Sequence, residues 1–367
     1  MNTLLFFISY IIILILINYN KVEKIVLIGA GYAGFKFMDA LKNLNKDKDN
    51  EILWLSKEDF MTKKWLMDSY IVKNKDEKVI VKVRDFIKEK GINVHFTEDE
   101  IESIDTEKKE ITGKKGKYNY TKLIIATGSK AKLPRIECAE SVKEKITSFN
   151  SFYDFKKVKE NLKDSKDVVI IGAGPIGFEL SVNLSKKFNV SLIEFESDIM
   201  LALLIGKPLY RKITGKILNL RNVNIYTLTK ACKFECDKLF CDNMETKENF
   251  YVLSGTIVFA AGVKQNLPVI DGYTFETEKN TLICNDFGEA WIREENGRRK
   301  ILKDVHTIGD ACYYLNIGNF PASAMFAERG GKNVAWNIFQ SGYKNKKRLD
   351  FNPSLYAKFL DMILRRL

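Results

Sequence analysis

Apolar residues gather in short runs along the chain, and two of these runs lead into the same pattern. Residues 25–28 (IVLI) and 167–171 (DVVII) have the length of a buried strand, and each leads directly into a G-x-G-x-x-G turn. Beyond each turn, apolar residues recur at helical spacing, which predicts a strand, a tight turn and a helix. The first glycines, Gly29 and Gly172, are 143 residues apart. The repeat predicts an α/β fold with two doubly wound, Rossmann-like domains.

Both turns have the composition of a dinucleotide-binding site. The first glycine allows the tight turn, the second lets a pyrophosphate approach the backbone, and the third lets helix and strand pack closely. The following helix presents free N–H groups and the positive end of its dipole to the phosphates. A purely structural glycine turn is the alternative. The candidate residues are Gly29, Gly31, Tyr32, Ala33 and Gly34 in the first turn and Gly172, Gly174, Pro175, Ile176 and Gly177 in the second.

The second strand of each unit is expected to end near the ribose of its nucleotide. Residues 190–193 form an apolar strand that ends on Glu194, 22 residues after the first glycine of that unit, where a ribose-binding carboxylate belongs. Residues 195–198 contain no Lys or Arg. A 2′-phosphate would be repelled there, so NADH is favoured over NADPH. In the first unit, either Glu58 reaches back to the ribose, or Ser56 and backbone groups bind it.

Three more strands end in small residues that would let the backbone approach a cofactor. They are predicted at 120–125, 255–260 and 305–309, and a helix with small residues in its first turns is predicted at 321–338. Asp310 is either the N-cap of a turn or a carboxylate that hydrogen-bonds a ribityl chain. The turn residues are Ala126, Thr127 and Gly128 after the first strand, Ala261 and Gly262 after the second, and Gly309 and Asp310 after the third.

Charge and cysteine content exclude several classes of protein. The net charge is +12, but no basic block is interleaved with aromatic residues, so no nucleic-acid site is predicted. The six cysteines lack the spacing of a small secreted disulfide fold, and reduced thiols are expected. Cys232, Cys236 and Cys241 lie close in sequence without a nearby histidine, so no metal site is predicted.

The N-terminal segment, residues 1–20, has no charged side chain. Twenty helical residues span about 30 Å, roughly the hydrocarbon core of a bilayer. Because a basic n-region and a cleavage site are missing, an uncleaved transmembrane anchor is favoured over a signal peptide or an interfacial or buried helix. Lys21 and Lys24 then place the catalytic body in the cytosol. Residues 346–367 are predicted to form an amphipathic helix, which either packs in the core, the commoner fate of such helices, or docks on membrane or protein.

These motifs, in this order, resemble the pyridine nucleotide–disulfide oxidoreductase superfamily over about residues 23–345. The segments 123–129 (LIIATGS), 177–180, 190–194 and 305–310 are most similar to apoptosis-inducing-factor-like, or ferroptosis suppressor protein-like, NAD(P)H:quinone oxidoreductases. The resemblance implies that FAD is bound by the first and last segments and NAD(P)H by the middle domain. Hydride would pass from nicotinamide to flavin, and two electrons to a quinone.

The resemblance also implies roles for individual residues. Glu179 matches a glutamate near the nicotinamide–flavin contact, with an ordinary helix carboxylate as the alternative. Residues 35–44 lack the cysteine pair of the disulfide reductases, so disulfide exchange is excluded as the main chemistry. The positions implied for FAD are Gly29, Gly31, Gly34, Thr127, Gly128 and Asp310, and those for the nicotinamide nucleotide are Gly172, Gly174, Gly177, Glu194 and Gly262.

We therefore predict a membrane-anchored, FAD-dependent NADH oxidoreductase that reduces a quinone. The first alternative is a reductase of a soluble electron-transfer protein, and the second is an NADH-sensing flavoprotein that turns over slowly. The oligomeric state is open. The predicted regions are a membrane anchor at 1–20, a discontinuous FAD domain at 21–145 and 263–345, an NAD(P)H domain at 146–262 and the C-terminal helix at 346–367.

Overall fold

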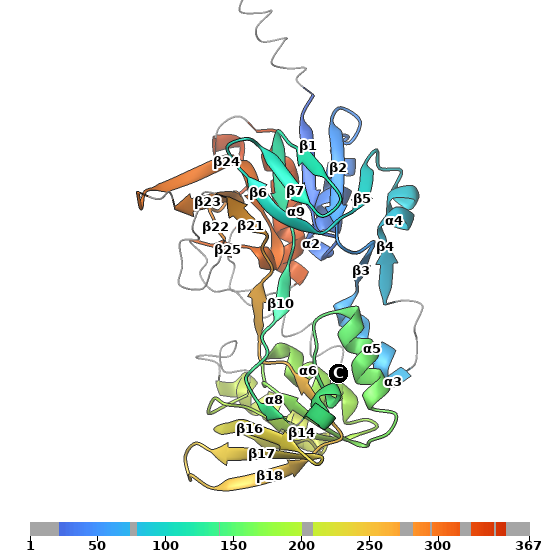
Figure 1. Cartoon of the computed structure of the whole chain (residues 1–367), viewed down its shortest axis with the longest axis vertical. Coiled ribbons are helices and arrows are strands. Elements are labelled where there is room, and N and C mark those ends of the chain that lie inside the picture. Colours follow the sequence, from blue (N-terminus) through green and yellow to red (C-terminus); the bar gives the residue numbers. More distant parts are fainter. Residues whose placement is uncertain are drawn as a thin grey trace, which may run out of the picture.

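The chain folds into two α/β units that are joined by a pair of short strands (Figure 1). The predicted anchor lies outside the residues described by the computed structural model, as does most of the predicted C-terminal helix. The described residues are 22–73, 79–138, 140–199, 208–271, 282–293, 296–315, 324–340 and 343–349.

The first unit is built on an eight-stranded sheet with the order β25-β22-β23-β24-β9-β1-β2-β5. The run from β24 to β5 is parallel, and β23 pairs antiparallel with both of its neighbours. The strands are β1 (Lys24–Ile28), β2 (Glu51–Ser56), β5 (His95–Glu98), β9 (Lys122–Ile125), β22 (Ile283–Cys284), β23 (Glu289–Arg293), β24 (Arg299–Thr307) and β25 (Tyr313–Tyr314).

Alternate side chains of β1 pack into different layers, because successive residues of a strand point to opposite faces of the sheet. Ile25 and Leu27 share a core with residues of the helices α2 (Tyr32–Asn43) and α9 (Ala324–Asn337). Val26 and Ile28 pack against a four-stranded sheet with the order β21-β6-β7-β8. Its strands are β21 (Val269–Asp271), β6 (Ile101–Asp105), β7 (Glu110–Gly113) and β8 (Lys117–Asn119). Both faces of β1 are therefore buried, which explains its uninterrupted apolar sequence.

The second unit repeats this layering around a five-stranded parallel sheet with the order β12-β19-β13-β14-β15. Val168 and Ile170 pack with helical residues, and Val169 and Ile171 face the sheet β11-β16-β17-β18. The parallel strands are β12 (Ile146–Ser148), β19 (Thr256–Phe259), β13 (Asp167–Ile171), β14 (Asn189–Ile193) and β15 (Asn224–Tyr226). The covering elements are α5 (Phe152–Asn161), α6 (Pro175–Leu184), α8 (Pro208–Leu220), β11 (Glu137–Cys138), β16 (Thr229–Glu235), β17 (Lys238–Asn243) and β18 (Asn249–Leu253).

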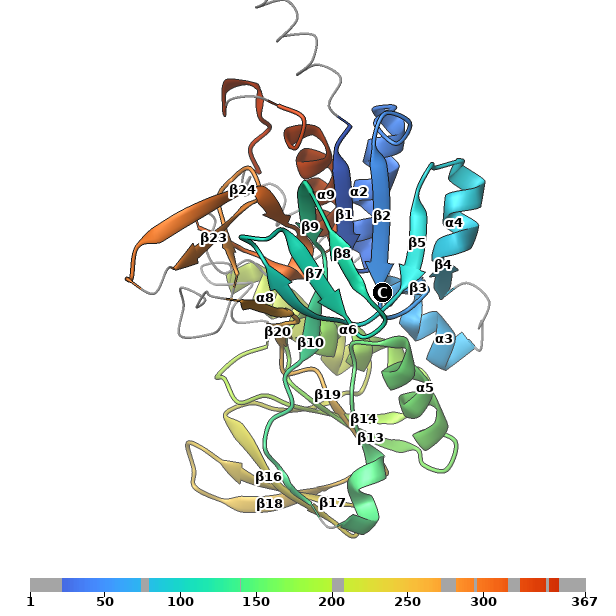
Figure 2. The same cartoon turned by 45° about the horizontal axis from the view of Figure 1, so that its top comes forward.

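Two antiparallel strands, β10 (Ser129–Ala131) and β20 (Val263–Gln265), pair with each other between the units (Figures 1 and 2). The domain limits given above stay a prediction, with β20 returning the chain to the first unit. They differ from the sheet pairing at one point, because β11 pairs with β16 of the second unit although it precedes residue 146. The remaining elements are β3 (Phe60–Thr62), η1 (Lys64–Leu66), α3 (Met67–Lys73), β4 (Ile80–Lys82), α4 (Val83–Lys90), η3 (Glu140–Lys145), η4 (Gly309–Ala311) and η5 (Tyr343–Asn345).

The two predicted α/β domains are confirmed, whereas the predicted terminal helices are not supported. Within the described ranges, no helix is long and apolar enough to cross a membrane, and residues 1–20 lie outside those ranges. Residues 346–349 are not helical, and residues 350–367 are not among those described. The late helix begins in the described chain at Ala324, because residues 321–323 also lie outside it.

Candidate functional site

The first glycine turn connects β1 to α2, and its three glycines face different surroundings. Gly29 has φ +112°, and a Cβ built on it would lie 2.4 Å from the Ala126 carbonyl oxygen. A Cβ on Gly34 would lie 2.4 Å from the Gly29 oxygen. Gly31 has an ordinary φ of −80°, and its Cβ would approach only the Ala126 oxygen, at 3.9 Å. Gly29 and Gly34 thus permit close packing, while Gly31 leaves open space in front of the turn.

The second glycine turn, between β13 and α6, divides these roles in the same way. Gly172 has φ +105°, and a Cβ on it would lie 2.7 Å from Ala260 backbone atoms. A Cβ on Gly177 would lie 1.8 Å from the Gly172 oxygen, whereas a Cβ on Gly174 would meet nothing within 4 Å. Pro175 opens α6, and Ile176 follows it with its side chain exposed. Each turn therefore has room at its middle glycine, which fits a pyrophosphate lying against the backbone.

The second strands of the two units reach their glycine turns with different side chains. The Glu194 carboxylate accepts hydrogen bonds from the Ala173 and Glu196 amides. In the first unit, the Ser56 hydroxyl accepts from the Ala30 amide at 3.2 Å and from the Glu58 amide at 3.3 Å. The structure thus brings Ser56 to the first turn in the way that Glu194 is brought to the second. Both side chains can therefore orient a ribose at the turn that they touch.

Glu58 lies two residues beyond Ser56 and is half-buried. Burial raises the pKa of the Glu58 carboxyl above its ordinary value, with Lys57 acting in the opposite direction. A raised pKa means that the site has few groups that favour the charged form.

The small-residue turns lie where the two units meet. Ala126 packs on the first glycine turn, and within the described chain the buried Thr127 hydroxyl has no hydrogen-bond partner. Gly128 and Gly262 immediately precede the paired strands β10 and β20, and Ala261 precedes Gly262. The Lys132 amide donates to the Gly262 oxygen at 2.9 Å. An orphaned hydroxyl beside a glycine turn fits a bound cofactor with polar atoms.

The late Gly309-Asp310 motif lies beside the first glycine turn. A Cβ on Gly309 would lie 2.9 Å from the Ala33 Cβ, and the Ser129 hydroxyl donates to Asp310 Oδ2 at 2.9 Å. The Tyr32 hydroxyl donates to Glu328 of α9, also at 2.9 Å. Burial and this carboxylate raise the pKa of Tyr32 to about 12. Segments almost 300 residues apart are therefore brought together around one turn.

Lys64, on η1, is a site residue that the sequence analysis missed. Lys64 Nζ donates to Asn150 Oδ1 at 2.6 Å, and Asn150 Nδ2 donates to the Ser129 oxygen at 2.8 Å. These hydrogen bonds connect Lys64 of the first unit to Asn150, at the start of the second unit. They continue from Asn150 to Ser129, whose hydroxyl donates to Asp310. Lysine is abundant throughout this sequence, so no sequence signal distinguished Lys64.

Carboxylates from both units act on the Lys64 ammonium group. Its side chain is exposed to solvent, and its Nζ contacts Asn150 of the second unit. Desolvation by the neighbouring protein lowers the pKa of the ammonium group, although Asp310 and Asp154 oppose the shift. Glu179, the predicted catalytic carboxylate, lies half-buried on α6, and its backbone oxygen accepts from Asn183 Nδ2 at 3.0 Å.

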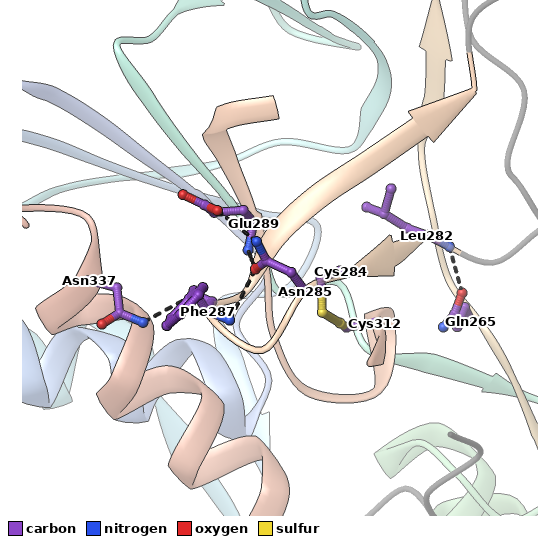
Figure 3. Close-up of a disulfide and its surroundings, with 8 residues drawn as sticks. All are labelled: Gln265, Leu282, Cys284, Asn285, Phe287, Glu289, Cys312 and Asn337. Carbon is purple, nitrogen blue, oxygen red and sulfur yellow. Dashed lines mark hydrogen bonds between the residues drawn. A yellow bond between two sulfur atoms is a disulfide. The ribbon is translucent and has the colours of Figure 1, made fainter. Parts of the chain in front are cut away.

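The expectation that all six cysteines are reduced is wrong at one pair. Cys284 and Cys312 form a disulfide, with their Cα atoms 6.4 Å apart (Figure 3). The folded chain brings these two residues together although 28 positions separate them in sequence. The free cysteines are Cys138, Cys232, Cys236 and Cys241.

The fold and the paired turns define a protein with one glycine turn of the dinucleotide-binding type in each of its two α/β units. The chain belongs to the pyridine nucleotide-disulphide oxidoreductase family, whose model matches residues 23–331. Members of this family are FAD-dependent NAD(P)H oxidoreductases, and FAD and NAD(H) are their typical cofactors. The chain is therefore an NAD(P)H-dependent flavin oxidoreductase.

Individual relatives are distant but cover much of the chain. An NADH-rubredoxin oxidoreductase of Clostridium acetobutylicum is 26% identical over 320 residues, which are 86% of this chain and 75% of that protein. Human apoptosis-inducing factor 3 is 26% identical over 181 residues, 49% of this chain and 29% of that protein. The crystal structure of a covalent putidaredoxin reductase–putidaredoxin complex matches with a TM-score of 0.70 at 15% identity, over 86% of this chain and 75% of that one, and supports the fold.

The predicted localisation, a membrane-anchored protein with its catalytic body facing the cytosol, is contradicted. No helix in the described part of the chain could span a membrane. The similar protein of Clostridium acetobutylicum is named for rubredoxin and not for a membrane component.

Proposed function

We propose that this chain transfers electrons from NADH, through FAD, to a small soluble electron-transfer protein. The observation that carries the proposal is the similarity, over 86% of the chain, to a protein named for NADH and rubredoxin. The contacts between the units are compatible with it, because Lys64 and Asn150 link the two units and Ser129 links Asn150 to Asp310 beside the first turn. The quinone that the sequence predicted as acceptor has no comparable support.

FAD is held, in this proposal, by the turn between β1 and α2 and by the segments that pack on it. Gly31 leaves space for the pyrophosphate, and Ser56 replaces the ribose-binding carboxylate. The free Thr127 hydroxyl and Asp310 provide polar contacts for the rest of the cofactor. The complete proposed set is Gly29, Gly31, Tyr32, Ala33, Gly34, Ser56, Glu58, Ala126, Thr127, Gly128, Gly309 and Asp310.

NADH is held by the turn between β13 and α6, with Glu194 orienting its adenosine ribose. Gly174 leaves space for the pyrophosphate, as Gly31 does in the first unit. Glu179 lies half-buried on the same helix and is proposed as the catalytic carboxylate. The complete proposed set is Gly172, Gly174, Pro175, Ile176, Gly177, Glu179, Glu194, Ala261 and Gly262.

Bound FAD supplies the chemistry that accepts a hydride from nicotinamide and releases electrons to an acceptor. The protein contributes orientation and charge. The Lys64 ammonium, fixed by Asn150 at 2.6 Å, places a positive charge where the two units meet. Preorganised charge of this kind stabilises negative charge that develops during reaction.

Glu194→Ala is expected to raise the KM for NADH about 10- to 100-fold, because a ribose hydroxyl loses a charged acceptor. Discrimination against NADPH should shrink at the same time, because the carboxylate that repels the 2′-phosphate is gone. Steady-state kinetics with both nucleotides measure the change. Glu196→Ala is the matched control, since the exposed Glu196 side chain is two residues further on. Equal KM values in wild type and Glu194→Ala would contradict the role.

The acceptor is tested with the full chain loaded with FAD, comparing purified rubredoxin with a short-chain ubiquinone under saturating NADH. Turnover with rubredoxin at least about 10-fold above that with quinone is expected. Faster turnover with quinone would overturn the proposed protein acceptor and support the quinone acceptor that the sequence predicted. Negligible turnover with both, together with a long-lived NADH–flavin charge-transfer band, would favour the slow NADH-sensing alternative.

A further inference from the structure

We propose that Cys284 and Cys312 form a thiol–disulfide exchange site, opened by a dithiol, that controls how firmly the Gly309-Asp310 turn is held. The proposal rests on the proposed function in one respect, namely that this turn contacts FAD. It adds a covalent modification site to a chain that lacks the cysteine pair on the helix after its first glycine turn.

The bridge is adjacent to the turn that it would control. The Cys312 amide donates to the Gly309 oxygen at 3.2 Å, so Cys312 closes the same short turn that presents Asp310. Asp310 in turn accepts from the Ser129 hydroxyl, which starts β10 between the two units. Asp310 and Cys312 are separated only by Ala311. A shift of the Cys312 backbone is therefore transmitted directly to Asp310.

The Cys284 half of the bridge is firmly anchored. The neighbouring Leu282 amide donates to Gln265 Oε1 at 3.1 Å, which links β22 to β20 (Figure 3). On the other side, Asn285 Oδ1 accepts from the Phe287 and Glu289 amides, both at 3.0 Å. Asn337 of α9 donates to the Phe287 oxygen at 3.2 Å (Figure 3).

In the described chain, the Cys312 half is held by the buried Ala311 before it and by a short strand after it. Beyond Cys312, β25 pairs with β22 over two residues only, with hydrogen bonds from the Tyr313 amide to Leu282 and from the Leu315 amide to Cys284. The disulfide is thus a large part of what ties the Gly309–Cys312 turn to the anchored strand. Breaking it leaves the Cys284 side in place and loosens the side that carries Asp310, which then depends on its remaining contacts.

The different exposure of the two cysteines indicates which sulfur atom the dithiol attacks. Cys284 is fully buried, whereas Cys312 is only partly buried, at the edge of a small cluster with Tyr314, Phe326 and Leu349. A thiolate of the dithiol attacks Cys312 Sγ, the S–S bond breaks, and Cys284 leaves as a thiolate that takes up a proton. The second thiol of the reagent then attacks the mixed disulfide. It releases Cys312 as a thiol and leaves the reagent oxidised, so two electrons and two protons have moved to the protein.

Two of the free thiols have surroundings that make competing exchange slow. Burial raises the pKa of the Cys241 thiol to about 12, and burial together with a hydrogen bond to Asp242 raises that of Cys232. Both are therefore protonated at neutral pH, and the protonated thiol is a poor nucleophile. Cys236 is exposed, which makes it a useful internal reference for labelling.

The experiment uses the full chain loaded with FAD, with dithiothreitol as the dithiol. After native incubation with or without dithiothreitol, iodoacetamide alkylation and peptide mass spectrometry report each cysteine. Ultrafiltration measures FAD dissociation in the same samples. We expect Cys284 and Cys312 to be alkylated only after dithiothreitol, and the dissociation constant for FAD to rise about 10-fold. Cys284→Ser/Cys312→Ser should reproduce this rise without reductant, and Cys236→Ser should not.

Three results would overturn the proposal. They are alkylation of both cysteines without reductant, a bridge that resists dithiothreitol in the native protein, and a reduced bridge with unchanged FAD retention. If the double serine variant fails to fold, the dithiothreitol arm on the wild-type chain decides alone. A chain that never binds FAD refutes the proposed function instead, and alkylation still reports the exchange separately.

Discussion

Gly31→Val is expected to yield a folded protein that purifies without FAD. The φ of −80° at Gly31 is allowed for valine, and a Cβ there meets only one protein atom, at 3.9 Å. The new side chain therefore fills the space in front of the turn without distorting the turn itself. Overpacking of a filled site costs up to about 3 kcal/mol, so FAD affinity should fall about 100-fold.

The matched variant is Gly174→Val in the second turn. Its φ is −69°, and a Cβ there meets nothing within 4 Å, so it too should fold. This variant should purify yellow but should need about 100-fold more NADH for flavin reduction. Absorbance spectra, circular dichroism and anaerobic NADH titration separate the two cases. A yellow Gly31→Val protein, or normal NADH titration of Gly174→Val, would refute the assignment of that turn.

Lys64→Met is expected to slow flavin reduction by NADH about 100-fold, the effect of removing one preorganised charge from a reacting site. Lys64→Arg should retain most of the rate at neutral pH because it keeps the charge. Stopped-flow absorbance under anaerobic conditions measures both rates. Lys63→Met is the matched control, since it removes the same charge one residue away. If Lys63→Met and Lys64→Met are equally slow, a general charge effect replaces the specific role.

The pH dependence gives a second test of Lys64. Burial lowers the pKa of its ammonium group below the ordinary value of 10.5. The positive charge is therefore present at low pH and is lost as the pH rises through this lowered pKa. The reduction rate of the wild type should fall along that alkaline limb, below pH 10.5, while Lys64→Arg should show no fall there. An identical limb in both proteins would assign the titration to another group.

The sequence by itself predicted those features that depend on residues close together in the chain. An apolar run, a glycine turn and a helical period predict a strand, a turn and a helix, and this pattern placed β1, α2, β13 and α6. Spacing alone placed Glu194 at the end of β14, where it contacts the second turn. For Ser56 and Glu58 the sequence left two readings open. In the folded chain, the Ser56 hydroxyl contacts the Ala30 amide of the first turn, which favours the reading that relies on Ser56.

Only the tertiary structure decided the contacts between distant segments. Lys64 meets Asn150 across 86 residues, and Ser129 meets Asp310 across 181. No local periodicity encodes such pairs, because they depend on how two sheets are stacked and joined by β10 and β20. The same holds for Cys284 and Cys312, which β22 and η4 bring into bonding distance. Local patterns thus determined the two glycine turns, whereas long-range packing created the contacts between the units and the disulfide in the first unit.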